Sequence, residues 1–96
     1  DHELAAQFMH KRPARKRIAA FLLSLSTRAA RRGDSTTELH LPMSRTDIGN
    51  YLGITLETVC RELARLEKSG IISLHKRELA ILDLPRLREP ICEDPR

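Results

Sequence analysis

The sequence is short of the residues on which catalytic, metal-binding and disulfide-stabilised proteins depend. Its two cysteines, Cys60 and Cys92, are far apart, and neither has another Cys or His at metal-ligand spacing, which argues against a zinc site and a disulfide framework. No nucleophile–base pair and no glycine-rich phosphate loop is recognisable, so we expect no enzymatic activity. No apolar run is long enough for a membrane span and no leader opens the chain, so we expect a cytoplasmic protein.

Aromatic residues are scarce and charged residues are unevenly distributed. Aromatics make up 3% of the chain, which disfavours the base-stacking surfaces of proteins that bind single-stranded nucleic acid. The net charge of +4 permits a polyanionic partner without identifying one. Residues 4–33 contain no acidic residue, and their basic residues form either a solvated helix face or phosphate contacts. These residues are Lys11, Arg12, Arg15, Lys16, Arg17, Arg28, Arg31 and Arg32.

The first half of the chain predicts a long helix followed by a short strand. The length and the 41% hydrophobic content are those of one domain with a modest core. After Pro13, apolar residues recur at helical spacing, which predicts a helix over residues 13–31. Alternation over residues 38–43 predicts a short strand with Leu39 and Leu41 on one side.

Residues 44–69 predict two short helices joined by a tight turn. Ser44 is a good N-cap for the first helix, with Asp47 placed to complete a capping box, and Gly53 supplies the left-handed conformation that ends it. Thr55 caps the second helix, predicted over residues 55–69, whose apolar seam consists of Val59, Leu63 and Leu66. This is the helix-turn-helix arrangement, in which the second helix enters the major groove of double-stranded DNA.

The residues that follow predict a β-hairpin and an irregular C-terminus. Two apolar runs, residues 71–74 and 78–82, are separated by a basic tip of His75, Lys76 and Arg77. A strand, a helix-turn-helix and a basic hairpin in this order predict a mainly α fold with small β-hairpins, the winged helix-turn-helix, over residues 13–84. Residues 85–96 are expected to form a short turn, over 85–89, and a flexible tail.

The exposed side of the predicted second helix carries side chains that can read bases. Arg61 has the donor fork that matches guanine, and Glu57 can accept a hydrogen bond from cytosine N4. The same two residues are spaced i, i+4 and could instead form a surface ion pair. Candidate phosphate contacts lie at the two helix N-termini and at the hairpin tip: Ser44, Arg45, Thr55, Thr58, Lys76 and Arg77.

A resemblance to the C-terminal domain of the Crp-Fnr family of bacterial transcription regulators is carried by SRTDIGNYLGITLETVCRELARLEKSGII, residues 44–72. The resemblance covers about residues 17–84 and favours the fumarate-nitrate and nitrogen-fixation regulator branch, through DIGNYLG and ETVCR. It implies an activator that binds a palindrome of TTGAT-like half-sites as a homodimer and contacts RNA polymerase. In such a regulator the base contacts would come from Glu57, Arg61 and Leu56, and the backbone contacts from Arg45, Thr55, Thr58 and His75. For His75 the alternative is a solvated turn residue.

Cys60 is a departure from the family pattern. It stands where this branch usually has Ser, so the base preference set by that contact is open, although Cys60 remains a candidate base contact. A thiol early in the helix and beside Arg61 is a candidate for oxidation, which would place charge or bulk in the groove. The alternative is a small residue tolerated at the edge of the reading face.

The resemblance also implies parts of the regulator beyond this sequence. The chain begins with Asp-His-Glu-Leu, without Met, which suggests a piece of a longer protein. Any effector or iron–sulfur cluster would bind an upstream domain, so no cofactor is expected here. Residues 1–12 would be the remnant of a linker or dimerisation helix, and this piece alone is expected to be monomeric. An alternative function is a winged-helix domain that docks onto another protein through Leu56 and Cys60.

Overall fold

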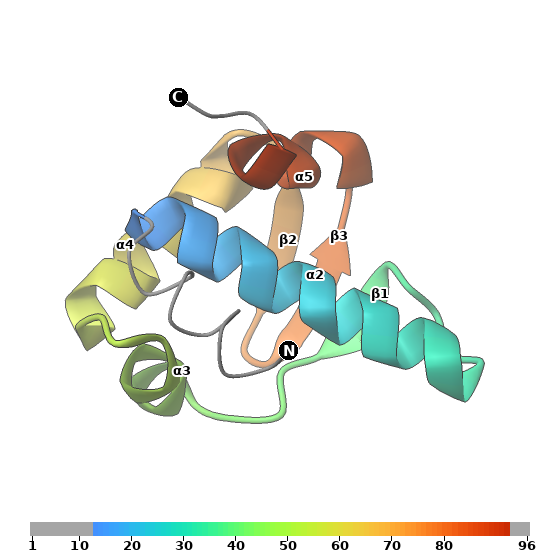
Figure 1. Cartoon of the computed structure of the whole chain (residues 1–96), viewed down its shortest axis with the longest axis horizontal. Coiled ribbons are helices and arrows are strands. Elements are labelled where there is room, and N and C mark those ends of the chain that lie inside the picture. Colours follow the sequence, from blue (N-terminus) through green and yellow to red (C-terminus); the bar gives the residue numbers. More distant parts are fainter. Residues whose placement is uncertain (1–12, 93–96) are drawn as a thin grey trace.

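The computed structural model describes residues 13–92, which form four helices and a three-stranded sheet. The predicted linker remnant, residues 1–12, and residues 93–96 of the predicted tail lie outside the described residues. The elements follow one another as α2, β1, α3, α4, β2, β3 and α5 (Figure 1). The fold is the predicted one, a mainly helical domain with a small antiparallel sheet. None of the helices within residues 13–92 has the length and apolarity to cross a membrane.

The longest helix, α2 (Ala14–Arg32), runs across the molecule and separates α5 from α3 (Figure 1). It ends at Gly33, whose φ of 81° allows the N–H of Asp34 to donate to the carbonyl oxygen of Ala29. The predicted helix is confirmed to within one residue at each end. Its buried face consists of Ile18, Ala19, Phe21, Leu22, Leu25, Ser26 and Ala29.

The helix-turn-helix consists of α3 (Arg45–Leu52) and α4 (Leu56–Lys68). Ser44 Oγ accepts a hydrogen bond from Asp47 N at 3.1 Å, and Thr55 Oγ1 accepts one from Thr58 N at 3.1 Å. Gly53, with a φ of 76°, ends α3. Both predicted caps and the turn are therefore confirmed. They were predictable because each depends only on residues a few positions away.

The central strand of the sheet, β3, is the last strand in the sequence. Strands β1 (Glu38–His40) and β2 (Ile72–His75) each pair antiparallel with β3 (Glu78–Ile81), in the order β1-β3-β2. Leu39 and Leu79 are in register and both are buried. β1 is shorter than the predicted strand over residues 38–43. The ladder stops after Leu41 N donates to Arg77 O, because Pro42 has no N–H with which to continue it.

The hairpin of β2 and β3, residues 72–81, is the wing. Its turn contains two residues, Lys76 and Arg77, because His75 is the last residue of β2 and pairs with Glu78. The predicted three-residue tip was therefore one residue too long. Lys76 adopts a φ of 57°, and within residues 13–92 it is the one residue other than glycine with a positive φ.

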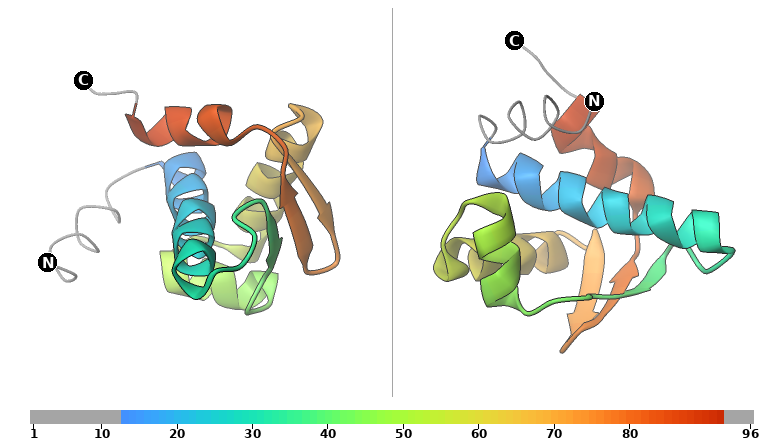
Figure 2. Two further views of the ribbon diagram at one scale, coloured as in Figure 1. Left: turned by 90° about the vertical axis from the view of Figure 1, so that its right-hand side faces the viewer. Right: turned by 60° about the horizontal axis from the view of Figure 1, so that its bottom comes forward.

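The C-terminal segment forms a helix where the sequence predicted one turn and a tail. Helix α5 (Leu84–Cys92) follows Asp83, whose Oδ1 accepts from Arg86 N at 3.1 Å, and Pro85 lies in its first turn, where proline is tolerated. Leu87 is completely buried in the core, and α5 lies across one end of α2 (Figure 2). The predicted end of the folded part was wrong because Leu87 supplies a core residue.

Candidate nucleic-acid interface

Helix α4 has the buried and exposed sides that its sequence predicts. Val59 and Leu63 are buried, and Leu66 is half-buried against the core. The opposite side exposes the polar or small side chains Thr55, Glu57, Cys60, Arg61, Ala64 and Arg65, and it also exposes Leu56, at 47%. Glu62 is buried although its residue type is charged, which the sequence interpretation did not anticipate. The first two turns of α4 therefore present a mixed polar and apolar surface to solvent.

A chain of hydrogen bonds orders the N-terminal end of α4. Thr55 Oγ1 donates to Thr58 Oγ1 at 2.8 Å, and Arg61 Nη2 donates to the same Thr58 oxygen at 3.4 Å. A hydroxyl has one hydrogen to donate, so the Thr55 hydroxyl is committed to Thr58, whereas the Thr58 hydrogen is available to a further acceptor. Thr58 is thus the better phosphate donor of the two, and it also orients Arg61.

Glu57 and Arg61 do not form the surface ion pair that their spacing allows. Within residues 13–92 the ion pairs of arginine are Arg32 with Asp34 and Arg86 with Asp83, and His40 Nδ1 lies 2.7 Å from Glu78 Oε2. Both Glu57 and Arg61 are exposed, and Arg61 is directed to Thr58 instead. The Glu57 carboxylate and most of the N–H donors of Arg61 are therefore available to a bound molecule.

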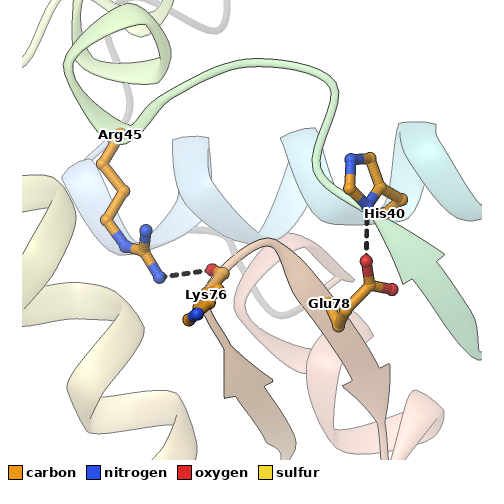
Figure 3. Close-up of polar contacts among 4 residues, drawn as sticks. All are labelled: His40, Arg45, Lys76 and Glu78. Carbon is orange, nitrogen blue, oxygen red and sulfur yellow. Dashed lines mark hydrogen bonds and ion pairs between the residues drawn. The ribbon is translucent and has the colours of Figure 1, made fainter.

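Arg45 joins the helix-turn-helix to the wing. Its Nη2 donates to the carbonyl oxygen of Lys76 at 2.8 Å, across 31 positions of sequence (Figure 3). Ser44 Oγ accepts a hydrogen bond as the α3 cap, and this bond does not use its hydroxyl hydrogen. Figures 1 and 2 show the wing turn at the same end of the domain as α3. The candidate phosphate contacts of α3 and of the wing therefore lie on one surface.

The wing turn is exposed and basic. His75, Lys76 and Arg77 are all exposed. Behind them, His40 and Glu78 are cross-strand partners, and His40 Nδ1 lies 2.7 Å from Glu78 Oε2 (Figure 3). Leu74 N donates to Glu67 Oε2 at 3.1 Å, so the outer edge of β2 is attached to the C-terminal part of α4. The wing is therefore held from both sides.

Arg17 has a structural contact that the sequence interpretation missed. Its Nη1 donates to Leu52 O at 2.9 Å and to Gly53 O at 3.3 Å, carbonyls at the C-terminal end of α3 that have no partner within the helix. Arg86 does the same for α4, since its Nη1 donates to Ser69 O at 3.0 Å. The sequence could have indicated that the last carbonyls of α3 and α4 need partners, because every helix leaves such groups unpaired. It does not indicate which arginine reaches them.

The described residues contain no group of three His, Cys, Asp or Glu side chains arranged to hold a metal ion. Cys60 is a free thiol and is exposed on α4, beside Arg61. Lys11 and Arg12, from the basic run, lie outside the described residues. The chemistry that this surface offers is hydrogen bonding, positive charge and one exposed apolar side chain, Leu56.

Comparisons with known proteins identify relatives of the same architecture. The Crp-like helix-turn-helix domain family matches residues 16–90. The "Transcriptional regulatory protein btr" of Bordetella pertussis is 51% identical over 79 residues, which are 82% of this chain and 33% of that protein. The "Fumarate and nitrate reduction regulatory protein" of Vibrio cholerae is 48% identical over 81 residues, covering 84% of this chain and 32% of that protein. The chain thus spans about a third of the length of these relatives.

Among solved structures, FixK2 from Bradyrhizobium japonicum superimposes with a TM-score of 0.74 at 37% identity, over 88% of this chain and 41% of that one. A putative Crp-Fnr regulator from Eubacterium rectale superimposes with a TM-score of 0.70 at 27% identity, over 91% of this chain and 38% of that one.

Proposed function

This chain belongs to the Crp-Fnr family of bacterial DNA-binding transcription regulators and carries the family's helix-turn-helix domain, and we propose that it reads a palindrome of TTGAT-like half-sites. Helix α4, the predicted recognition helix over residues 55–69, enters the major groove. The observation that carries the proposal is the pair Glu57 and Arg61. Both are exposed on the first turns of α4, and neither is neutralised by the other.

Each base contact has a specific chemical basis. The Arg61 fork donates to guanine O6 and N7, and the Glu57 carboxylate accepts from cytosine N4, so the pair reads adjacent positions on the two strands. Leu56, at 47% exposure, packs against a thymine methyl or the groove wall. Cys60 faces the groove between Glu57 and Arg61, and its small side chain leaves room for these two longer side chains.

The remaining candidates contact the DNA backbone. Thr58, with its available hydroxyl hydrogen, and the N-terminus of α4, which Thr55 caps, bind one phosphate. Ser44 and Arg45 at the start of α3 bind the backbone beside it. The wing residues His75, Lys76 and Arg77 bind phosphates further along the groove.

The longer regulator supplies the rest of the function. A second subunit would give the two-fold symmetry that a palindrome requires, and RNA polymerase would be contacted when the regulator is bound at a promoter. The domain alone is monomeric in this proposal, acts in the cytoplasm and performs no chemistry on DNA.

The test is selection of bound sites from random double-stranded DNA with a forced dimer of this domain, followed by affinity measurements. Arg61→Ala is expected to cost about 1–3 kcal/mol and to relax specificity at one base pair. Arg88→Ala, which removes an exposed charge from α5, serves as the control and should leave the selected sequence unchanged. Wild-type affinity and specificity in Arg61→Ala would overturn the proposal.

A further inference from the structure

Three consecutive residues at the wing tip are each held by a residue of the segment 40–45, which runs from the last residue of β1 to the first residue of α3. The Lys76 carbonyl accepts from Arg45 Nη2 at 2.8 Å, and the Arg77 carbonyl accepts from Leu41 N at 2.8 Å. Glu78 Oε2 lies 2.7 Å from His40 Nδ1. Figure 3 shows the two side-chain contacts at opposite ends of this connection. Residues 40–45 therefore form a strap across the wing tip.

The contact at Lys76 falls where the wing backbone is least favourable by itself. Lys76 has a φ of 57°, in the left-handed region that a residue with a Cβ adopts at a cost. The bond from Arg45 fixes the orientation of the carbonyl of Lys76 itself. Because both Lys76 and Arg77 are exposed, no core packing holds the turn in place.

Arg45 has more donors than this bond uses. A guanidinium has five N–H groups in a fixed planar fork, and one Nη2 hydrogen is directed to Lys76 O. Arg45 is half-buried at the N-terminal end of α3, next to the wing turn. The rest of the fork can bind an anion while the bond to the wing is kept.

We propose that Arg45 is a positioning residue that bonds the wing turn and a DNA phosphate at the same time, so that α3 and the wing engage the backbone as one rigid unit. This inference rests on the proposed DNA binding and assigns Arg45 a second role beyond a phosphate contact. A lysine at this position keeps the charge, but its single ammonium nitrogen lacks the two donor nitrogens that a fixed planar fork directs at two partners.

The experiment compares Arg45→Lys and Arg45→Gln with the wild type, with Arg88→Lys on α5 as the matched control. The first measurement is amide hydrogen exchange by NMR in the free domain, at Leu41, Arg77 and Glu78. Loss of the bond should accelerate exchange of the Leu41 amide, which donates to Arg77 O, about tenfold in Arg45→Gln and leave it unchanged in Arg88→Lys. The acceleration should be smaller in Arg45→Lys, because without DNA its ammonium group can still donate to the Lys76 carbonyl. Unchanged exchange in both Arg45 variants would overturn the proposal, even if DNA binding fell.

The second measurement is affinity for the selected site as a function of salt. Arg45→Lys should weaken binding about tenfold but keep the salt slope, since a positive charge still faces the phosphate, whereas Arg45→Gln should also reduce the slope by about one. Wild-type affinity in Arg45→Lys would overturn the double role. Failure of the wild type to bind any DNA would refute the proposed function and, with it, the phosphate half of this inference, while the exchange data would still report on the bond to the wing.

Discussion

At Gly49, α3 and the turn into α4 approach each other closely. A Cβ added at Gly49 would lie 2.7 Å from Ile54 O and 3.4 Å from Val59 Cγ2. The Gly49 carbonyl also accepts from Ile54 N at 2.9 Å, so the turn is tied to the helix at this point. The angle between α3 and α4 therefore depends on the absence of a side chain at Gly49.

We expect Gly49→Ala to destabilise the domain by about 1–3 kcal/mol, because the methyl group meets a backbone oxygen that is unable to move aside. Alanine is the better helix former by about 1 kcal/mol, so helix propensity alone predicts the opposite sign. Urea unfolding followed by circular dichroism measures the difference. Asn50→Ala, at the exposed neighbouring position, should change stability by less than about 0.5 kcal/mol. A Gly49→Ala variant at least as stable as the wild type would contradict the close approach.

For single residues, the sequence predicted the contacts whose two partners are close together in the chain. The caps Ser44 and Thr55 and the turn at Gly53 were predictable because their partners are three or four residues away. The partners of Arg17 and Arg45 lie 35 and 31 positions away, and a list of basic residues does not distinguish these two arginines from solvated ones. Glu57 and Arg61 were correctly placed on the exposed side of α4, and their contacts to bases remain a prediction.

Helix α5 is the element for which the sequence interpretation failed. One turn was predicted over residues 85–89, and a flexible tail was predicted beyond it because residues 90–96 contain two prolines and mixed charge. The structure shows that α5 (Leu84–Cys92) depends on tertiary packing against α2, with Leu87 completely buried. Short helices are stabilised mainly by such packing, which a local pattern does not report.

We expect Leu87→Ala to lower the free energy of unfolding by about 2–5 kcal/mol, as other buried leucine truncations do. Thermal unfolding of the purified domain measures this loss. Arg88→Ala is the comparison, because it changes an exposed residue of the same helix and should have little effect. If the two variants were equally stable, α5 would contribute nothing to the core.

The whole domain presents its candidate DNA contacts on one surface with a positive bias. Arg45, Lys76 and Arg77 come from α3 and the wing turn, and the bond from Arg45 to Lys76 O brings them together. Each cation that neutralises a phosphate releases a counterion, so the affinity for DNA must fall as salt is added.

For these three cations, the plot of log K against log salt concentration should have a slope of about −3 per domain. Fluorescence anisotropy with a labelled duplex, titrated at several KCl concentrations, measures it. Lys76→Ala should flatten the slope by about one and weaken binding to all sequences alike, whereas Arg88→Ala should leave it unchanged. A slope near zero for the wild type would be inconsistent with phosphate binding by α3 and the wing.

The strand order β1-β3-β2 also determines when the wing can form during synthesis of the chain. β1 has its partner 38 to 42 positions further on, in the strand that is made last, so closing this sheet costs loop entropy that the helix-turn-helix does not incur. On the ribosome, α3 and α4 can therefore form while β1 is still unpaired. The strap over residues 40–45 completes its contacts with the wing only after Glu78 has left the ribosome. The wing tip therefore forms late in folding.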